Sequence, residues 1–182
     1  MQPLQYPIYK GTGGNYGAIQ FNLSLPHYYK EKERSFDGLD HKGLSIFERS
    51  ETGRLHLKEG WKTREGAVFM EITSTKGKNI YDWANKITLA LSVNDLSQVL
   101  LTLLTGQECS IMHDPGAKTE AQGAKKKWLK ISSPGGTAKG AIVSVTQQAG
   151  GEKISHTVPM SGHEVVALKA LLERAITQAL NW

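Results

Sequence analysis

Lysines and aromatic side chains are combined in this sequence in a pattern suited to holding a polyanion. The densest example is Lys125–Ser132, KKKWLKIS, in which lysines stand on both sides of a tryptophan. In a β-strand neighbouring side chains point to opposite faces, so Lys126, Trp128 and Lys130 would share the polar face. Stacking of a nucleic-acid base on a ring in this position contributes about 1–3 kcal/mol to binding, while the ammonium groups contact the phosphates.

The same combination of cations, rings and polar groups recurs elsewhere in the chain. Each instance alone is also compatible with a surface ring packed under a lysine stem. Together they favour a single-stranded nucleic acid, because no basic recognition helix for reading a duplex is visible. The candidate nucleic-acid-binding residues are Tyr9, Lys10, Tyr16, Gln20, Asn22, Trp61, Lys62, Phe69, Lys76, Lys78, Lys125, Lys126, Lys127, Trp128 and Lys130.

Motifs for catalysis are not found in the sequence. It contains no Gly-x-Ser-x-Gly, His-Glu-x-x-His or Cys-x-x-Cys pattern. The adjacent pairs His113-Asp114 and His163-Glu164 are better explained as polar residues at a strand end and in the first turn of a helix. The glycine-rich segment Gly11–Gly17 lacks the Gly-Lys-Ser or Gly-Lys-Thr of a phosphate loop, which favours a turn. We therefore expect a protein that is not an enzyme, with no cofactor and no metal.

Composition bounds the class of protein and its compartment. The 182 residues suit one domain, and 22 Lys and Arg against 17 Asp and Glu give a net charge of +5, a modest preference for acidic partners. The single cysteine, Cys109, excludes an internal disulfide and fits a reducing compartment. No apolar run reaches the ~18–20 residues of a membrane span, and the first residues resemble neither a signal nor a transit peptide. We expect a cytoplasmic protein with no membrane partner, or an organellar one if the chain is a trimmed form.

Alternating apolar and polar residues, typical of half-buried strands, recur through the chain. In Lys86–Ser92, for example, three aliphatic residues lie at alternate positions. The charge-dense segment His27–Lys42 instead predicts an exposed loop. The predicted strands are 17–25, 43–48, 54–58, 67–75, 86–92, 108–114, 125–132, 141–147 and 153–159.

Two helices are predicted, each opened by a capping motif. Ser92 precedes Asp95 by three residues, and Gly106 ends the apolar periodicity that follows. Ser161 precedes Glu164 in the same way, and an apolar stripe then continues to the end of the chain.

The chain therefore divides into two halves with one plan, about 1–106 and about 107–182. Each half has antiparallel strands with one apolar face and then a helix. Since an apolar sheet face needs a partner, we expect two packed antiparallel β-sheets in a single α+β domain, residues 1–182. The second helix is apolar over a wide surface, which suggests self-association. The candidate oligomer-interface residues are Val166, Leu171, Ala175 and Leu180.

Several short motifs occur in an order that is more specific than any one of them. They are Ile8–Gly11, Tyr81–Trp83, Leu91–Val93, Glu108–Ser110, His113–Pro115, Lys127–Lys130 and Asn181-Trp182. In this order the chain resembles the Whirly family of single-stranded DNA-binding proteins, loosely over most of its length. Within the first motif, Tyr9-Lys10-Gly11 resembles the start of the family's Tyr-Lys-Gly-Lys-Ala-Ala-Leu motif.

The resemblance implies a fold and a mode of binding. The fold would be two roughly perpendicular four-stranded antiparallel sheets, each followed by a helix, and the helices would hold a homotetramer together. Single-stranded DNA would run along the sheet edges between neighbouring protomers, with bases packed on aromatic and apolar side chains. Little sequence preference would follow, because every base has a face on which to stack.

The chain also departs from the family pattern. After Gly11 the motif's second lysine and its Ala-Ala-Leu are not in place, and in the family this motif is linked to DNA and to larger assemblies of tetramers. Assembly beyond a tetramer is therefore not expected. Residues 27–51 look like an insertion relative to plant members, which begin with transit peptides. These differences point to a bacterial or viral (phage) member, or to a trimmed chain.

Three hypotheses describe the partner. The first is a non-catalytic single-stranded DNA-binding protein that acts in genome maintenance, replication, repair or transcription. The second is an RNA-binding member, like the related guide-RNA-binding proteins of kinetoplast mitochondria, which would recognise the 2′-hydroxyl. The third is a protein–protein scaffold whose basic charge is incidental, and its binding would not depend on salt.

Overall fold

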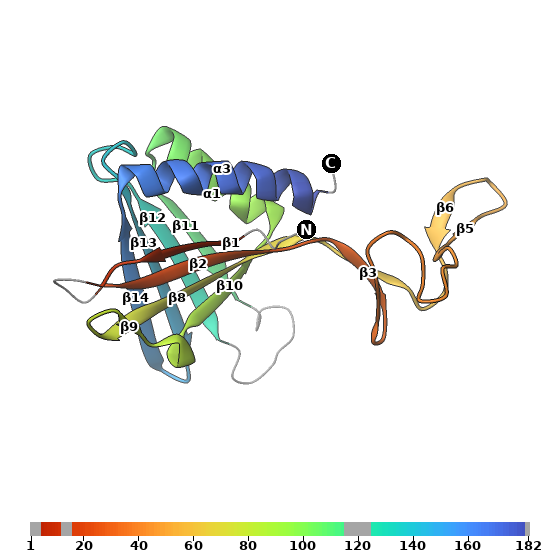
Figure 1. Ribbon diagram of the computed structural model, residues 1–182, viewed down its shortest axis with the longest axis horizontal. Helices are drawn as coiled ribbons and strands as arrows, with labels where there is room; N and C mark the ends of the chain where they lie inside the picture. The colour runs from red at the N-terminus through yellow and green to blue at the C-terminus, as the bar shows by residue number, and fades with distance from the viewer. Residues whose placement is uncertain (1–4, 12–15, 115–124, 181–182) are drawn as a thin grey trace.

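The computed structural model describes residues 5–11, 16–114 and 125–180. Part of the glycine-rich segment (residues 12–15), the loop 116–124 and the terminal Asn181-Trp182 lie outside the described residues. The described chain contains two large antiparallel sheets, two α-helices and a long projection (Figure 1).

The first sheet is built from the N-terminal half. In spatial order its strands are β1 (Gln5–Tyr9), β2 (Gly17–Ser24), β8 (Ala67–Gly77) and β10 (Ile87–Leu91). All of these pairs are antiparallel, and the short β9 (Ile80–Tyr81) pairs with β8. The predicted alternation is confirmed, because Phe21, Met70 and Leu89 are all buried on the same face.

The second sheet is an antiparallel meander from the C-terminal half. Its strands are β11 (Cys109–His113), β12 (Lys126–Ser132), β13 (Ala141–Ala149) and β14 (Glu152–Met160). Leu129 and Val145 lie directly opposite each other on β12 and β13, and both are fully buried. The inner face predicted for this half is therefore confirmed.

The helices begin where the capping motifs predict. The turn η1 (Trp83–Asn85) precedes β10, and the helices are α1 (Val93–Thr105) and α3 (Gly162–Ala179). Ser92 with Asp95, and Ser161 with Glu164, both form capping boxes. Gly106 adopts a left-handed conformation with φ of 78°, which lets the chain leave α1 at that residue.

The hydrophobic core lies between the two sheets and beneath the helices. Side chains of both sheets form one buried cluster with Leu96 of α1 and Leu168 of α3. The helices contact each other and lie side by side across one end of the sheets (Figure 1). Within the described chain, neither helix has the combination of length and apolar character that crossing a membrane requires.

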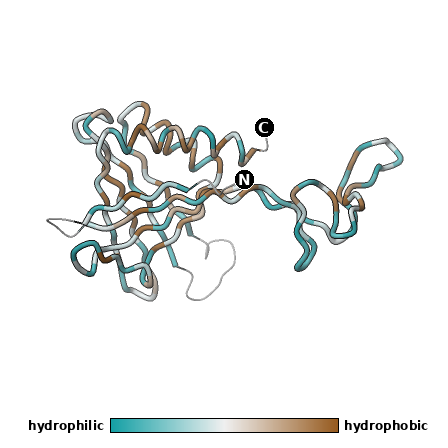
Figure 2. Tube along the Cα trace, viewed as in Figure 1, coloured by the Kyte–Doolittle hydropathy of each residue, from teal (hydrophilic) through white to brown (hydrophobic). Residues whose placement is uncertain are grey.

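Residues 27–65 leave the first sheet between β2 and β8 and project away from the body, and we call them the arm (Figure 1). Its strands are β3 (His27–Lys30), β4 (Glu33–Ser35), β5 (Phe47–Arg49), β6 (Leu55–Leu57) and β7 (Lys62–Arg64). They form a three-stranded sheet in the order β4-β3-β7 and a β5-β6 hairpin. The part of the arm around β3 is largely hydrophilic (Figure 2).

The first half differs from the sequence prediction in one loop, in the place of two strands and in its first strand. The segment 27–42 was expected to be a loop, but it holds β3 and β4, because local hairpin pairing satisfies the backbone of a polar sequence. The strands predicted at 43–48 and 54–58 correspond to the shorter β5 and β6, which pair with each other in the arm. The first sheet also contains β1, a strand that residue alternation did not reveal.

Candidate nucleic-acid interface

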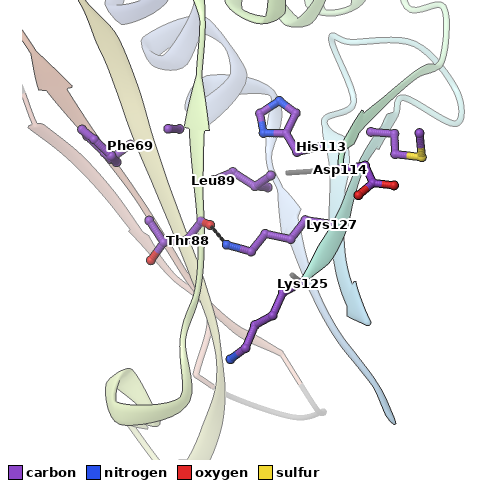
Figure 3. Close-up of a pocket in the computed structure, with 9 residues that line it drawn as sticks. Phe69, Thr88, Leu89, His113, Asp114, Lys125 and Lys127 are labelled. Carbon is purple, nitrogen blue, oxygen red and sulfur yellow. Dashed lines mark hydrogen bonds between the residues drawn. The ribbon is translucent and has the colours of Figure 1, made fainter. Parts of the chain in front are cut away.

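A cleft lies where the edge of the first sheet faces the edge of the second. Its volume is about 720 Å³, and β8 and β10 border it on one side and β11 and β12 on the other (Figure 3). Its lining combines a phenyl ring, aliphatic groups, two lysines and one carboxylate, and consists of Phe69, Thr88, Leu89, Ala90, Met112, His113, Asp114, Lys125 and Lys127. This size lies within the range of ligand sites in proteins.

Lys127 points from β12 into the cleft. Because side chains alternate along a strand, it shares the inner side of β12 with Leu129, while Lys126 lies on the outer side. Its Nζ donates a hydrogen bond of 2.6 Å to the backbone carbonyl of Thr88 in β10, so it spans the gap between the sheets (Figure 3). The predicted binding residue is therefore placed at the cleft, but on the side of the strand opposite to Trp128.

The charged form of a lysine is disfavoured in the cleft unless an anion binds beside it. Burial lowers the pKa of Lys127 below its ordinary value of 10.5, and the positive charge of Lys125 lowers this pKa further. The side chain of Lys125, which is exposed, also lines the cleft. Two like charges at one partly desolvated site favour an anionic ligand between them.

Phe69, Gln20 and Asn22 lie on the face of the first sheet that turns away from the core. Asn22 is directly opposite Phe69, which in turn is opposite Ala90 of β10. The amide of Gln20 donates to the Asn22 side chain at 2.9 Å. The structure thus brings three predicted residues together, and the half-buried Phe69 carries this surface into the cleft.

His113 is a cleft residue that the sequence did not single out for binding. Its Nε2 lies 3.2 Å from a carboxylate oxygen of Asp95, the capping residue of α1. Its place in the motif shared with the family was an available signal, whereas neutral lining residues such as Thr88 and Met112 gave none. In the part of the chain that the structure describes, His, Cys, Asp and Glu side chains form no group of three that could hold a metal ion.

Lys126 and Lys130 lie on the outer face of β12, as predicted, but both are paired with acids. Lys126 lies 2.8 Å from a carboxylate oxygen of Asp114, and Lys130 lies 2.9 Å from one of Glu108. Both acids flank β11, the neighbouring strand. A phosphate would have to compete with these carboxylates for either lysine.

Trp128 is less exposed than its position between lysines suggests. It is half-buried and lies directly between Met112 of β11 and Thr146 of β13. Since Met112 is 59% exposed and also lines the cleft, Trp128 lies next to the rim of the cleft and outside its lining.

Tyr9, Lys10 and Tyr16 line a different cavity, of about 380 Å³, beside the end of β14. The ring of Tyr9 packs against Tyr81, with centroids 5.2 Å apart. Lys10 forms an ion pair of 2.6 Å with Glu164, the capping carboxylate of α3. Lys10 is therefore engaged in joining the N-terminal segment to the second helix.

Glu164 is held in its charged form by this pair. Burial raises the pKa of the Glu164 carboxyl, but hydrogen bonds from Lys10 and Ser161 outweigh that effect and place the pKa below its ordinary value of 4.5. The same carboxylate accepts from the backbone N–H of Ser161 at 2.8 Å. The pair thus links folding stability to the ionisation of this carboxyl.

The four remaining candidates lie in two further places. Trp61 and Lys62 belong to the arm, where Lys62 begins β7. Lys76 and Lys78 lie at the hairpin between β8 and β9, and Lys76 is 2.8 Å from a carboxylate oxygen of Asp82. The structure therefore distributes the predicted binding residues over separate regions.

The four candidate oligomer-interface residues fall into a buried pair and an exposed pair. Leu171 and Ala175 are buried in the chain's own core, at 9% and 0% exposure, so they are not available to a partner. Val166 and Leu180 are exposed, at 65% and 39%. On α1, Leu101 and Leu104 are also more than half exposed and extend the apolar surface of the helix layer.

Two packed antiparallel sheets, each followed by a capped helix, make this chain an α+β domain with a cleft between its sheet edges. The chain belongs to the Whirly transcription factor family, whose model matches residues 44–171, more than two thirds of the sequence. This confirms the family and the fold class expected from the sequence.

Relatives with similar sequences are named single-stranded DNA-binding proteins. The chloroplastic WHY1 of Solanum tuberosum is 25% identical over 121 residues, which cover 66% of this chain and 44% of that protein. The chloroplastic WHY1 of Zea mays is 27% identical over 120 residues, 65% of this chain and 45% of that protein. The mitochondrial WHY2 of Arabidopsis thaliana is 23% identical and covers 76% of this chain and 56% of that protein. The chain therefore spans about half the length of the curated relatives it matches.

Solved structures support the same fold. WHY1 from Arabidopsis thaliana superposes with a TM-score of 0.70 at 19% identity, covering 100% of this chain and 93% of that one. The plant transcriptional regulator PBF-2 superposes with a TM-score of 0.65 at 21% identity, covering 100% and 85%. At these identities the likeness concerns the fold.

Proposed function

We propose that this protein binds single-stranded DNA without catalysis and with little sequence preference, and that it holds the strand in the cleft between its two sheets. The observation that carries the proposal is that Phe69, Lys125 and Lys127 line one cleft in a chain of the Whirly family. Its relatives are named for binding single-stranded DNA. The protein would act in genome maintenance, replication, repair or transcription.

The chemistry of the cleft suits an unpaired strand. Bases would stack on Phe69 and pack on Met112 and Ala90, and phosphates would meet Lys125 and Lys127. A phosphate beside Lys127 would offset the cost of its burial and raise its lowered pKa. In a duplex the base faces are already stacked on each other, so only the electrostatic part of this binding would be available.

The proposal is tested by fluorescence anisotropy with one labelled sequence as single-stranded DNA, as a duplex and as RNA. We expect the single strand to bind at least about tenfold more tightly than the duplex, since stacking contributes about 1–3 kcal/mol per base. We also expect its affinity to fall steeply as salt rises. Equal binding of duplex, or binding that does not depend on salt, would contradict the proposal. Tighter binding of the RNA would change the substrate class.

We further propose that the chain assembles into a homotetramer through its helix layer. The exposed leucines Leu101 and Leu104 of α1 and Val166 of α3 supply an apolar surface on that layer. Light scattering would give the molar mass of the wild type and of Leu101→Lys/Leu104→Lys. A tetramer that dissociates in the variant supports the proposal, and a monomeric wild type contradicts it.

The compartment is proposed to be a reducing one. Cys109 is the single cysteine of the chain, so no internal disulfide can stabilise the fold. The relatives are named as chloroplastic or mitochondrial proteins. Cytoplasm and organelle interior both satisfy this requirement, and imaging of a tagged full-length chain in its own cell would distinguish them.

A further inference from the structure

The arm carries its own surface of cations and rings. In the sheet β4-β3-β7, Tyr29 is directly opposite Arg34 on one side and Lys62 on the other, so these three share a face. His27 is opposite Arg64 in the next row of the same face, because alternate residues of a strand point the same way. We call this surface, His27, Tyr29, Arg34, Lys62 and Arg64, the arm face.

The arm face is hollowed. A concavity of about 460 Å³ is lined by His27, Tyr29, Glu31, Lys32, Arg34 and Arg64. Rings lie at and beside it, since the ring of the buried His27 packs against Tyr29, which also lines the concavity, and against Phe36, with centroids 6.1 Å and 5.8 Å away. Phe36 itself is 64% exposed, so much of its ring surface stays available beyond its contact with His27.

The cations of the arm face are free. Within the described parts of the chain, Arg34, Lys62 and Arg64 take part in no ion pair and no side-chain hydrogen bond, and all three are exposed. Glu33, from the same sheet, is instead turned to His41, 3.3 Å away. Among the residues that line the concavity, Glu31 is the single acid, so the surface keeps a positive excess.

The base of the arm is packed against the body. A Cβ atom on Gly66 would lie 2.7 Å from the Cα of Ala179 in α3 and 3.0 Å from the Cδ of Pro26, so nothing larger than glycine fits between them. Phe69 of the cleft follows Arg64 by five residues, which span at most about 17 Å even when fully extended. The arm face and the cleft are therefore joined by one short, closely packed segment.

We propose that the arm face is a second binding site for single-stranded nucleic acid, which takes up the strand where it leaves the cleft. Phosphates would bind Arg34, Lys62 and Arg64, and bases would stack on Tyr29 and Phe36. The free guanidinium groups complement phosphate, and stacking on the half-buried Tyr29 and the exposed Phe36 requires unpaired bases, so the occupant is a single strand and not a duplex. This inference rests on the proposed function, because it extends the strand held in the cleft.

The test compares two oligonucleotide lengths on matched arginine variants. A single strand of about 8 nucleotides is short enough for one site, and one of about 40 reaches both. Arg34→Gln/Arg64→Gln removes two charges from the arm face. Arg49→Gln/Arg54→Gln removes two exposed charges from the β5-β6 hairpin of the same arm and serves as the control. Thermal unfolding confirms that each variant is folded before its affinities are compared.

We expect the arm-face variant to bind the long strand about tenfold more weakly, and to lower the salt slope by about 0.7 for each phosphate that is no longer neutralised. Its affinity for the short strand and both affinities of the control variant should match the wild type. Unchanged long-strand binding, or equal weakening at both lengths, would overturn the arm site and leave the cleft intact. A wild type that binds neither strand would overturn the proposed function itself.

Discussion

Two surfaces of this protein place cations beside rings, and they differ in whether those cations are free. On the outer face of β12, Lys126 and Lys130 flank Trp128, and each lies within 3 Å of a carboxylate oxygen. On the arm face, Arg34 and Lys62 flank Tyr29 and have no ion pair among the described residues. The strand that is more basic in the sequence is therefore the one whose outer cations are already occupied.

Alternation of residues along a strand does not determine which cations of that strand are paired with acids. Alternation assigns each lysine to a face of β12, but the acids that neutralise these lysines come from the neighbouring strand. Glu108 and Asp114 flank β11 and reach β12 only because the two strands are antiparallel neighbours. The unpaired cations, and the partly buried Lys127, therefore mark the surfaces where an anion is most favourable.

The largest expected loss of affinity distinguishes the cleft from the outer face of β12. Phe69→Ala removes the ring that lines the cleft, and single-strand affinity should fall about 10- to 100-fold, since one stacked base contributes about 1–3 kcal/mol. Trp128→Ala, outside the lining, should weaken binding less and leave the protein folded. Fluorescence anisotropy and a thermal melt of each variant measure both effects. A larger decrease in Trp128→Ala would move the site to the outer face.

A smaller decrease is expected when the cleft cation is removed. Lys127→Met keeps the stem of the side chain but removes the charge, so affinity should fall about fivefold and the salt slope by about 0.7. The free energy of unfolding should change little, because the loss of the hydrogen bond to Thr88 is offset by removal of a charge that burial disfavours. Lys126→Met is the control, with a paired ammonium group. Equal weakening in the two variants would contradict the distinction between lysines with and without a carboxylate partner.

The outer lysines as a pair should matter less still. Lys126→Gln/Lys130→Gln removes two charges, as the arm-face double variant does, but each of these ammonium groups is already close to a carboxylate. We expect a decrease of no more than about threefold in long-strand affinity, since exposed ion pairs are weak and partly screened. Anisotropy titrations at two salt concentrations measure it. A decrease greater than that of Arg34→Gln/Arg64→Gln would reverse the comparison.

The smallest effect on binding is expected at the Lys10–Glu164 pair, where the effect on stability is instead clear. Glu164→Gln should leave DNA affinity within about twofold and lower stability by about 1–2 kcal/mol at pH 7, because charge-assisted hydrogen bonds are removed. The folded pKa of Glu164 lies below its ordinary value of 4.5. Its contribution is therefore full above pH 4.5 and is lost as pH falls through the folded pKa. Thermal melts across this range should show the two proteins converge in acid, and a constant difference would count against the pair.

Much of the secondary structure of the body was predictable, because strand alternation and helix capping depend on residues close together in the sequence. Alternation identified the buried faces of β8, β10 and β12, and the capping motifs at Ser92 and Ser161 placed both helix starts. The joining of strands was less predictable, because period two indicates a strand without indicating its sheet. For that reason the sequence indicates strands near residues 47 and 55 but does not show that they pair only with each other in the arm.

The candidate site was predictable in its residue types and not in its boundaries. Lys125, Lys127 and Phe69 do meet in one cleft, although they come from strands far apart in the sequence. Lys10 belongs to a family-like motif, yet its partner Glu164 is 154 residues away. Such pairings depend on how the two halves pack, and no spacing within one segment encodes them.

The most direct test of the account is to map where a single strand lies on the protein. A photoactivatable thymidine strand, cross-linked to the wild type and analysed by peptide mass spectrometry, would locate the contact residues. We predict cross-links chiefly in the peptides that contain Phe69 and Lys125–Lys127, and further ones in the arm at Tyr29. Cross-links confined to α1 and α3, or to the cavity around Tyr9 and Tyr16, would contradict the cleft as the site of binding.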